Sequence, residues 1–300
     1  MSAAVLPPPS TTGTLGFWNG TKDNQEGYVD YRDRSSNVNL AREVEVSLKN
    51  IRCLDKKPSF AEDGYELRKI PTSLTTEELL AANDPEGKAR INDAVFAECA
   101  GILRQVLGDE PKILPTYFKV RQNREGEHSV SKMDNNAYNV RPYAHVDRDH
   151  NTISIPIHDA VGAEEAEVLT KKYRRWAQVN VWRPIRNNAT KWPLAIMKHD
   201  QIPDWEYDSQ IARIYSRNDN RTALRGVKAY DHIARYHPGY EYYYVSDMTP
   251  EEVLVFCSFD TDIKTVVPHS SFWDHNTPEG TPERASIEVR FVVFFDERKE

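Results

Sequence analysis

The chain has 300 residues and a formal net charge of −7, with 39 lysine and arginine residues against 46 aspartate and glutamate residues. It contains no block of basic residues, which excludes nucleic acid and anionic membranes as main partners, because phosphate binding needs clustered Lys and Arg. The mean hydropathy of −0.69 and the absence of a long apolar run exclude a transmembrane helix.

The first residues, MSAAVLPPPSTT, lack the basic and apolar regions of a secretory signal. We therefore expect residues 1–12 to be a flexible tail and residues 13–300 to form a single domain. The three cysteines, Cys53, Cys99 and Cys257, are odd in number, far apart and without a CxxC pair. This pattern predicts buried free thiols in a reducing compartment, so a cytoplasmic location is expected.

Helix signals dominate the part of the chain between residues 70 and 110. Residues 40–70 before it suggest strand and loop, with a turn at Asp63-Gly64. Thr75 and Glu78 form a capping-box pattern, and Asp84-Pro85 supplies an N-cap followed by an N1 proline. Apolar residues then recur at helical spacing as far as Gly108, which predicts an amphipathic helix over residues 85–107.

The sequence pattern changes after about residue 112, where short segments rich in β-branched and aromatic residues are separated by turns. The predicted strands are residues 115–121, 137–146, 152–157, 176–183, 194–198, 240–246, 253–259, 263–268 and 286–295. Residues 204–236 carry many charges and are predicted to be a helical or loop insertion. The expected fold is mainly β with flanking helices, in which helical support to about residue 110 backs a barrel or jelly roll over about 112–296.

A candidate metal site begins with His145-Val146-Asp147 at the end of a predicted strand. Residues i and i+2 of a strand face the same side, so both side chains can point into one cavity. His269 ends a later predicted strand. Two histidines and one carboxylate form the facial triad of non-haem iron(II) enzymes, which leaves coordination positions open.

Several alternatives to this triad remain open from the residues alone. Asp149 or His150 competes with Asp147 as the ligand, but both lie further into the predicted loop. His275 is the main rival to His269. A His-x-Asp pair is also common in surface turns that bind no metal.

Fifteen residues after His269, Arg284 and Ser286 open the last predicted strand. A bidentate arginine and a hydroxyl group suit a distal carboxylate. Arg290 shares their face by parity and is the second candidate for the anion. The alternative for Arg290 is a structural pair with an acid such as Glu288, because a buried arginine needs a partner.

The chain resembles the fungal oxidoreductases related to the aspergillic-acid hydroxylase, the gibberellin desaturase and the cephem 7-methoxylase component. The resemblance covers residues 45–296. It is carried in order by Gly64-Tyr65-Glu66-Leu67, His145-Val146-Asp147, Asn180-Val181-Trp182-Arg183-Pro184, Trp192-Pro193-Leu194-Ala195, Ser246-Asp247-Met248-Thr249-Pro250-Glu251-Glu252, Pro268-His269-Ser270-Ser271-Phe272 and Arg284-Ala285-Ser286-Ile287-Glu288-Val289-Arg290.

The resemblance implies a double-stranded β-helix, the cupin-like jelly roll, that uses iron(II), 2-oxoglutarate and O2. It implies iron ligands at His145, Asp147 and His269 and an anion-binding role for Arg284. Ala285 departs from the family, which usually has an acidic or polar residue there. The implied activity is oxidation of an unactivated C–H bond of a small organic molecule, by hydroxylation, desaturation or rearrangement, in secondary metabolism.

Two further residues are candidates for carboxylate binding. Arg183 shares a strand face with Val181, opposite Asn180 and Trp182, and either binds a carboxylate or closes the strand as a structural arginine. Tyr117 is a candidate hydrogen-bond donor to 2-oxoglutarate, with a core tyrosine as the alternative.

The aromatic residues Tyr240, Tyr242, Tyr243, Tyr244, Phe272 and Trp273 are candidates for an apolar pocket. Two other classes of protein fit the same residues. One is a cupin-type dioxygenase or isomerase that does not use 2-oxoglutarate, and the other is a metal-free binding protein.

Overall fold

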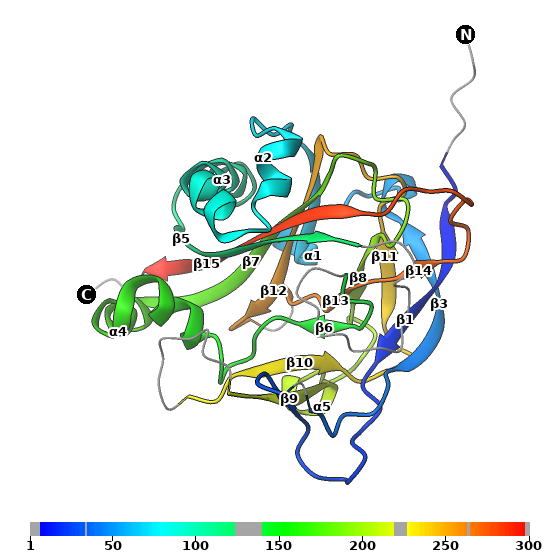
Figure 1. Cartoon of the computed structure of the whole chain (residues 1–300). Helices are drawn as coiled ribbons and strands as arrows, with labels where there is room; N and C mark the ends of the chain where they lie inside the picture. The colour runs from blue at the N-terminus through cyan, green and yellow to red at the C-terminus, as the bar shows by residue number, and fades with distance from the viewer. Residues whose placement is uncertain (1–6, 34, 124–139, 219–226, 263–264, 298–300) are drawn as a thin grey trace.

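The computed structural model describes residues 7–33, 35–123, 140–218, 227–262 and 265–297. Its strands form two sheets that face each other, as Figure 1 shows. The larger sheet has the order β14 (Trp273–Asp274), β1 (Ser10–Phe17), β3 (Arg42–Asn50), β11 (Glu241–Tyr244), β8 (Leu194–Lys198), β13 (His269–Ser271), β6 (His145–Val146), β10 (Tyr230–Ala234), β9 (Ile211–Arg217) and β2 (Tyr28–Asp30). The smaller sheet has the order β4 (Tyr65–Lys69), β12 (Glu252–Asp260), β7 (Tyr173–Ile185), β15 (Ala285–Glu297) and β5 (Lys112–Gln122).

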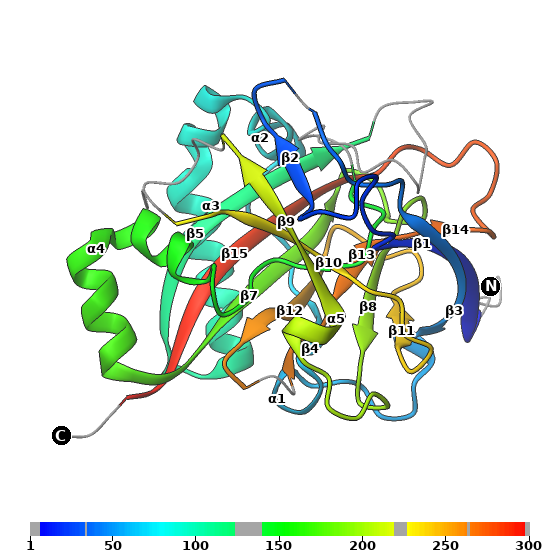
Figure 2. The ribbon, with the colours of Figure 1, turned by 90° about the horizontal axis from the view of Figure 1, so that it is seen from below.

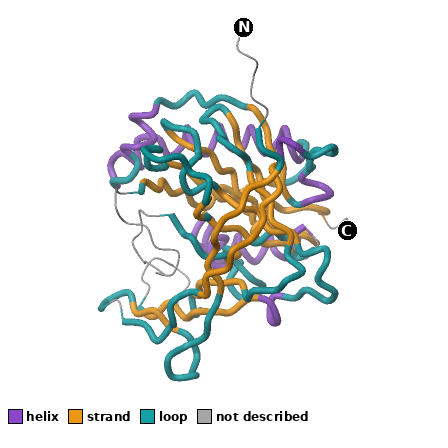
Figure 3. Tube along the Cα trace, turned by 90° about the vertical axis from the view of Figure 1, so that its right-hand side faces the viewer, coloured by secondary structure: helices purple, strands orange, loops and turns teal. Residues whose placement is uncertain are grey.

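The strand pairs are antiparallel except for β11 with β3 and β2 with β9. Apolar side chains of both sheets, such as Ile196, Trp182 and Phe256, meet in one buried cluster between them. In Figure 3 the strands occupy the centre of the molecule and the helices lie around them. This arrangement confirms the predicted mainly β jelly roll with flanking helices.

The helices are α1 (Phe60–Asp63), α2 (Thr76–Ala81), α3 (Pro85–Leu107), α4 (Ser154–Lys172) and α5 (Tyr207–Gln210), with a 3₁₀ turn at Ile51–Cys53. The long helix α3 and the short α2 cover the outer face of the five-stranded sheet (Figures 1 and 2). Ile91, Val95 and Leu103 of α3 are buried against that face. None of the helices in the described ranges is long and apolar enough to cross a lipid bilayer.

The predicted helix starts and stops are confirmed. The side chain of Asp84 accepts a hydrogen bond from the Gly87 amide, Pro85 opens α3, and Gly108 follows its last residue with a φ of 82°. Thr75 and Glu78 form the capping box of α2. The predicted strands at residues 115–121, 176–183, 194–198, 240–246, 253–259 and 286–295 are confirmed as β5, β7, β8, β11, β12 and β15.

Other predictions are wrong. Ser10, in the predicted tail, starts β1, which pairs with β3. The N-terminal part that was predicted to be helical support also contributes strands to both sheets, with β1, β2 and β3 in the larger sheet and β4 in the smaller one. The predicted insertion at residues 204–236 contains β9 and β10 as well as α5. Cys99 and Cys257 are buried free thiols, as predicted, but Cys53 is exposed.

Residues 152–157, predicted as a strand, lead into helix α4. The side chain of Asp149 accepts hydrogen bonds from the Asn151 amide and from the Thr152 amide and hydroxyl, so the chain turns before the helix. Pro156 lies in the first turn, where its missing N–H costs no intrahelical hydrogen bond. Local turn chemistry thus overrides the β-propensity of this segment.

Two predicted strands fall partly outside the described residues. Of residues 137–146, the first three are not described and only His145–Val146 form a strand. Of residues 263–268, the first two are not described and the rest precede β13, which begins at His269.

Candidate metal centre

The side chains of His145, Asp147 and His269 meet between the two sheets. One ligand atom from each lies within 4.8 Å of the others, and all three side chains are buried. His145 and His269 are directly paired residues of β6 and β13, and their ring centroids are 4.3 Å apart. Val146, between the two ligands, packs into the apolar core. The alternation expected for a strand thus brings His145 and Asp147 to one side.

Both imidazole rings are fixed through their Nδ1 atoms. The Nδ1 of His145 lies 2.9 Å from the carbonyl oxygen of Tyr143, and that of His269 lies 3.4 Å from the carbonyl oxygen of Val267. A donating Nδ1 leaves Nε2 with its lone pair. The Nε2 of His269 is buried and has no hydrogen-bond partner among the described residues. Such an orphaned acceptor is costly unless something binds it, so the residues fit a metal ion.

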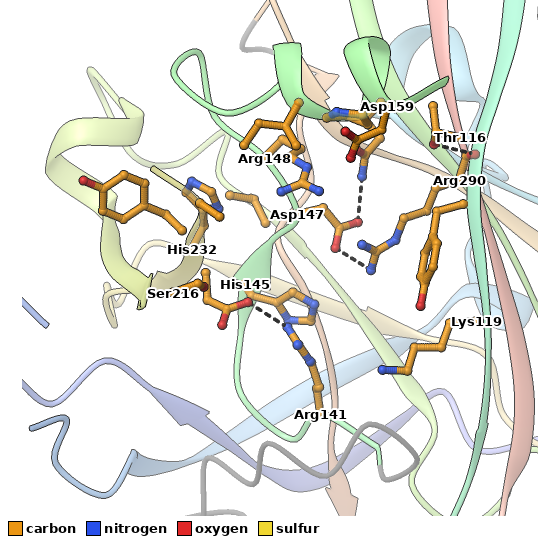
Figure 4. A pocket seen from close by; sticks show the side chains of 18 of the residues that line it. Thr116, Lys119, Arg141, His145, Asp147, Arg148, Asp159, Ser216, His232 and Arg290 are labelled. Atoms are coloured by element: carbon orange, nitrogen blue, oxygen red, sulfur yellow. Dashed lines mark hydrogen bonds and ion pairs between the residues drawn. The ribbon is translucent and has the colours of Figure 1, made fainter. Parts of the chain in front are cut away.

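Asp147 is held on both of its oxygens. Its Oδ2 accepts hydrogen bonds from Asn180 at 2.7 Å and Gln178 at 3.1 Å. Its Oδ1 lies 2.7 Å from Nη2 of Arg290, as Figure 4 shows. These contacts fix the orientation of the carboxylate, as neighbouring groups do for metal ligands.

The electrostatics favour the protonation states that metal binding requires. Burial, reinforced by His269, holds the pKa of His145 well below its usual value, and burial lowers the pKa of His269. Burial raises the pKa of Asp147, but Arg290 and the two histidines outweigh it and hold that pKa below the usual range. The site therefore offers two neutral imidazoles and a carboxylate near neutral pH.

A cavity of about 350 Å³ opens beside the triad. Its walls come from β5, β7, β15, the segment around β6, the start of α4, and β9 with β10 (Figure 4). Its charged lining residues are Lys119, Arg121, Arg141, Asp147, Arg148, Asp159, Asp231 and Arg290. The cavity is large enough for a small organic ligand.

The rival ligands are not part of this cluster. Asp149 instead contacts Thr152, Arg213 and His232. His150 is exposed and packs on the rings of Tyr207 and Phe259. His275 is exposed and contacts Thr14 and Glu45 on the sheet edge.

The two candidate anion-binding arginines differ in their partners. Arg290 contacts Asp147 and also donates to Oε1 of Glu288, at 2.8 Å from Nε and 2.5 Å from Nη2. Arg290 thus forms the structural pair with Glu288 that was the alternative interpretation. These contacts do not support its predicted role as an anion anchor.

Arg284 and Ser286 are both buried, and neither is among the residues that line the cavity. Arg284 donates to the carbonyl oxygen of Trp192 and lies 5.2 Å from the ring of Trp182, while its Nε has no hydrogen-bond partner among the described residues. Burial, together with Arg121, lowers the pKa of Arg284 to about 9. Among the residues that the structure describes, no carboxylate is in direct contact with this cation, so it is suited to receive one.

Tyr117 lies at the mouth of the cavity and is 44% exposed, so the core-tyrosine alternative is wrong. Arg183 lies on the opposite face of its sheet, 3.7 Å from Glu98 of α3. The structure does not bring Arg183 to the triad, so these contacts do not support its predicted carboxylate-binding role at the site.

The predicted aromatic pocket is also wrong. Tyr240, Tyr242, Tyr244 and Phe272 belong to a buried apolar cluster, and the aromatic rings among the described residues that line the cavity are Tyr117, Tyr143 and Tyr230. A core aromatic and a pocket aromatic have the same sequence signal, since both alternate on strands.

Sequence analysis missed most of the polar lining. Lys119 and Arg121 alternate with Tyr117 on β5, so the parity of that strand was a signal that could have found them. The contacts of Gln178 and Asn180 with Asp147 had no local signal, because they join residues 31 and 33 positions apart. His232 lines the cavity from β10, a strand that was not predicted.

Comparison with known proteins agrees with this architecture. Oxidoreductase R1 from Phoma sp. is 46% identical over 299 residues, which cover 98% of this chain and 100% of that protein. Hydroxylase/desaturase asaB from Aspergillus flavus is 33% identical over 151 residues, covering 47% of this chain and 63% of that protein. The predicted resemblance to the fungal oxidoreductases is confirmed.

The fold is shared with a solved structure, that of the iron and alpha-ketoglutarate-dependent endoperoxidase NvfI. It superposes with a TM-score of 0.74 at 17% identity and covers 97% of this chain and 99% of that one. The family model described as Oxidoreductase/YMDC permease-like domain matches residues 15–294. The chain therefore belongs to this family of oxidoreductases.

Proposed function

We propose that this protein is an iron(II)- and 2-oxoglutarate-dependent oxygenase that oxidises an unactivated C–H bond of a small organic molecule. The observation that carries the proposal is the buried cluster of His145, Asp147 and His269, beside a cavity. Two imidazoles and one carboxylate with open positions are the ligand set of non-haem iron(II) oxygenases. Iron, 2-oxoglutarate and O2 would together supply the oxidant.

The protein's part is to hold the ligands and the cosubstrate in place. The carbonyl groups of Tyr143 and Val267 orient the two rings, and Asn180 and Gln178 orient Asp147. These groups are preorganised around the place where the ion would sit, which lowers the cost of binding it.

Arg284 and Ser286 are the proposed anchor of the far carboxylate of 2-oxoglutarate. Arg284 is buried, its Nε has no hydrogen-bond partner in the described part of the chain, and the two residues share one face of the chain by parity. Arg290 is already occupied by Asp147 and Glu288. Tyr117, at the cavity mouth, stays a candidate donor to the same carboxylate.

Relatives support a role in oxidising small molecules. A protein named hydroxylase/desaturase is similar to half of this chain, and the similar fold belongs to an endoperoxidase. Hydroxylation, desaturation and rearrangement differ only in how substrate is placed beside the metal. We include all three in the proposal, and we place the reaction in secondary metabolism.

The test is to add iron(II) and 2-oxoglutarate to the protein without oxygen and record the weak visible charge-transfer band of an iron-bound 2-oxo acid. We expect the band in the wild type and in His275→Ala, an exposed histidine outside the cluster. We expect no band in His145→Ala or His269→Ala, because each variant removes one ligand.

The other outcomes identify the rival classes. Stoichiometric iron without the band would favour a cupin-type enzyme that does not use 2-oxoglutarate. Failure of the wild type to bind iron would favour a metal-free binding protein and would sink the proposal.

A further inference from the structure

The cavity beside the triad is positively charged although the whole chain is negative. Of the described residues that line it, five are cations, Lys119, Arg121, Arg141, Arg148 and Arg290, and three are carboxylates, Asp147, Asp159 and Asp231. The surplus of two positive charges contrasts with the formal net charge of −7 for the chain.

Binding of the proposed cofactors would not remove this surplus. Iron(II) adds two positive charges and the 2-oxoglutarate dianion adds two negative ones. A cation in a half-enclosed space is unfavourable unless an anion or water meets it, so a lining cation whose donors are not all engaged favours an anionic ligand. The charge of the cavity therefore points to the molecule that shares it with 2-oxoglutarate.

The arginines of the lining differ in whether they already have an anionic partner. Arg290 contacts Asp147 and Glu288, and Arg141 lies 3.4 Å from Asp231. Arg148 forms no hydrogen bond or ion pair with any residue that the structure describes, and its Nε is buried without a partner. Arg148 thus has donors to spare among the described residues.

Arg148 is also close to the proposed reaction centre, because it follows Asp147 directly in the chain. Figure 4 shows Arg148 on one side of His145 and Arg141 on the other. An anionic group on Arg148 would hold the remainder of a small molecule beside the metal. The planar guanidinium is suited to two parallel hydrogen bonds with a carboxylate or a phosphate.

We propose that the substrate carries an anionic oxygen group, a carboxylate or a phosphate ester, that pairs with Arg148. Arg141 adds to the field that attracts it. The proposal rests on the proposed function, since it names the class of molecule that this oxygenase would oxidise.

The experiment uses the full chain loaded with zinc(II), which supports no turnover, and saturated with 2-oxoglutarate. Three probes of one chain length, hexanoate, hexyl phosphate and the neutral hexanamide, are titrated by calorimetry. We expect at least one of the two anions to bind about tenfold more tightly than hexanamide, as a charge-assisted hydrogen bond predicts. Preference for hexanoate indicates a carboxylate substrate, and preference for hexyl phosphate indicates a phosphate ester.

Two variants assign the preference to Arg148. Arg148→Met and Arg148→Gln should bind all three probes about equally, and the second keeps a polar side chain in case the first fails to fold. The matched control is Arg183→Met, which removes a buried arginine on the outer side of the sheet and should keep the preference.

The inference is overturned if anions and hexanamide bind alike, if no anion binds at about 1 mM, or if the preference survives in both Arg148 variants. Titration with 2-oxoglutarate alone separates these results from failure of the proposed function. Protein that binds 2-oxoglutarate but shows no anion preference sinks only the inference about the substrate.

Discussion

The two faces of the five-stranded sheet are both buried, but they carry different kinds of side chains. The outer face carries Val179, Val181 and Phe291 against α2 and α3, with Arg183 and Glu98 as a charged pair. The inner face buries hydrogen-bonded polar groups such as Asn180 and Arg290 around Asp147. Burial of apolar side chains stabilises the fold. Burial of polar groups costs free energy, so a buried polar network is expected where the protein holds a functional site. Function is therefore expected on the inner face, and variants of the two faces should behave differently.

The largest effect is expected for an aromatic residue of the outer face. Phe291→Ala removes a fully buried ring that packs edge-to-face on Phe96. It should lower the free energy of unfolding by about 3–5 kcal/mol, measured with urea. The protein that remains folded should bind iron(II) with unchanged affinity. A large loss of iron affinity would show that the two faces are not independent.

The second comparison replaces one buried arginine on each face. Arg284→Met should weaken 2-oxoglutarate binding by about 10–100-fold, because it removes charge-assisted hydrogen bonds to the far carboxylate. Arg183→Met should leave this affinity unchanged. Calorimetric titration of the zinc-loaded proteins measures both. Equal affinities in Arg284→Met and wild type would remove Arg284 from the site and return attention to Arg121 or Lys119, which line the cavity.

A smaller effect is expected from adjacent residues of β7 that face opposite ways. Asn180→Ala removes the 2.7 Å hydrogen bond to Asp147 and should lower iron(II) affinity by about 10–100-fold. Val181→Ala should lower stability without changing iron affinity, because Val181 packs toward α3. Competition with a chromogenic chelator gives the affinities. If both variants bind iron as the wild type does, Asn180 does not position Asp147.

The sequence correctly predicted those parts of this arrangement that a periodic pattern within one segment specifies. Helix α3 was predicted with its bounds because caps and apolar spacing agree along one segment. The triad was predicted because alternation places His145 with Asp147 and a later strand supplies His269. The resemblance to known oxidoreductases supported the choice of these three residues.

What sequence reasoning missed depends on which strands become neighbours. Arg290 and Arg284 have the same residue type and parity, and only the position of Asp147 across the cavity separates their roles. Strands β9 and β10 were missed because their charged, partly exposed residues resemble a loop when β6 is not known to lie beside them. Pairing between distant segments is a tertiary property that local propensity does not encode.

The smallest effect concerns the pH dependence of the metal-free protein. The pKa values of His145 and His269 are lowered in the folded state by burial, whereas the unfolded chain has the ordinary value of about 6.5. As the pH falls below that value the unfolded chain takes up protons that the folded protein does not. The contribution of these residues to stability is therefore present above about pH 6.5 and lost as the pH falls towards the folded-state values, at up to about 1.4 kcal/mol per pH unit for each histidine. His145→Gln should make this decline shallower in urea unfolding. An unchanged slope in His145→Gln would mean that the buried site takes up protons without cost, and the inner face would then be less isolated from water than its burial implies.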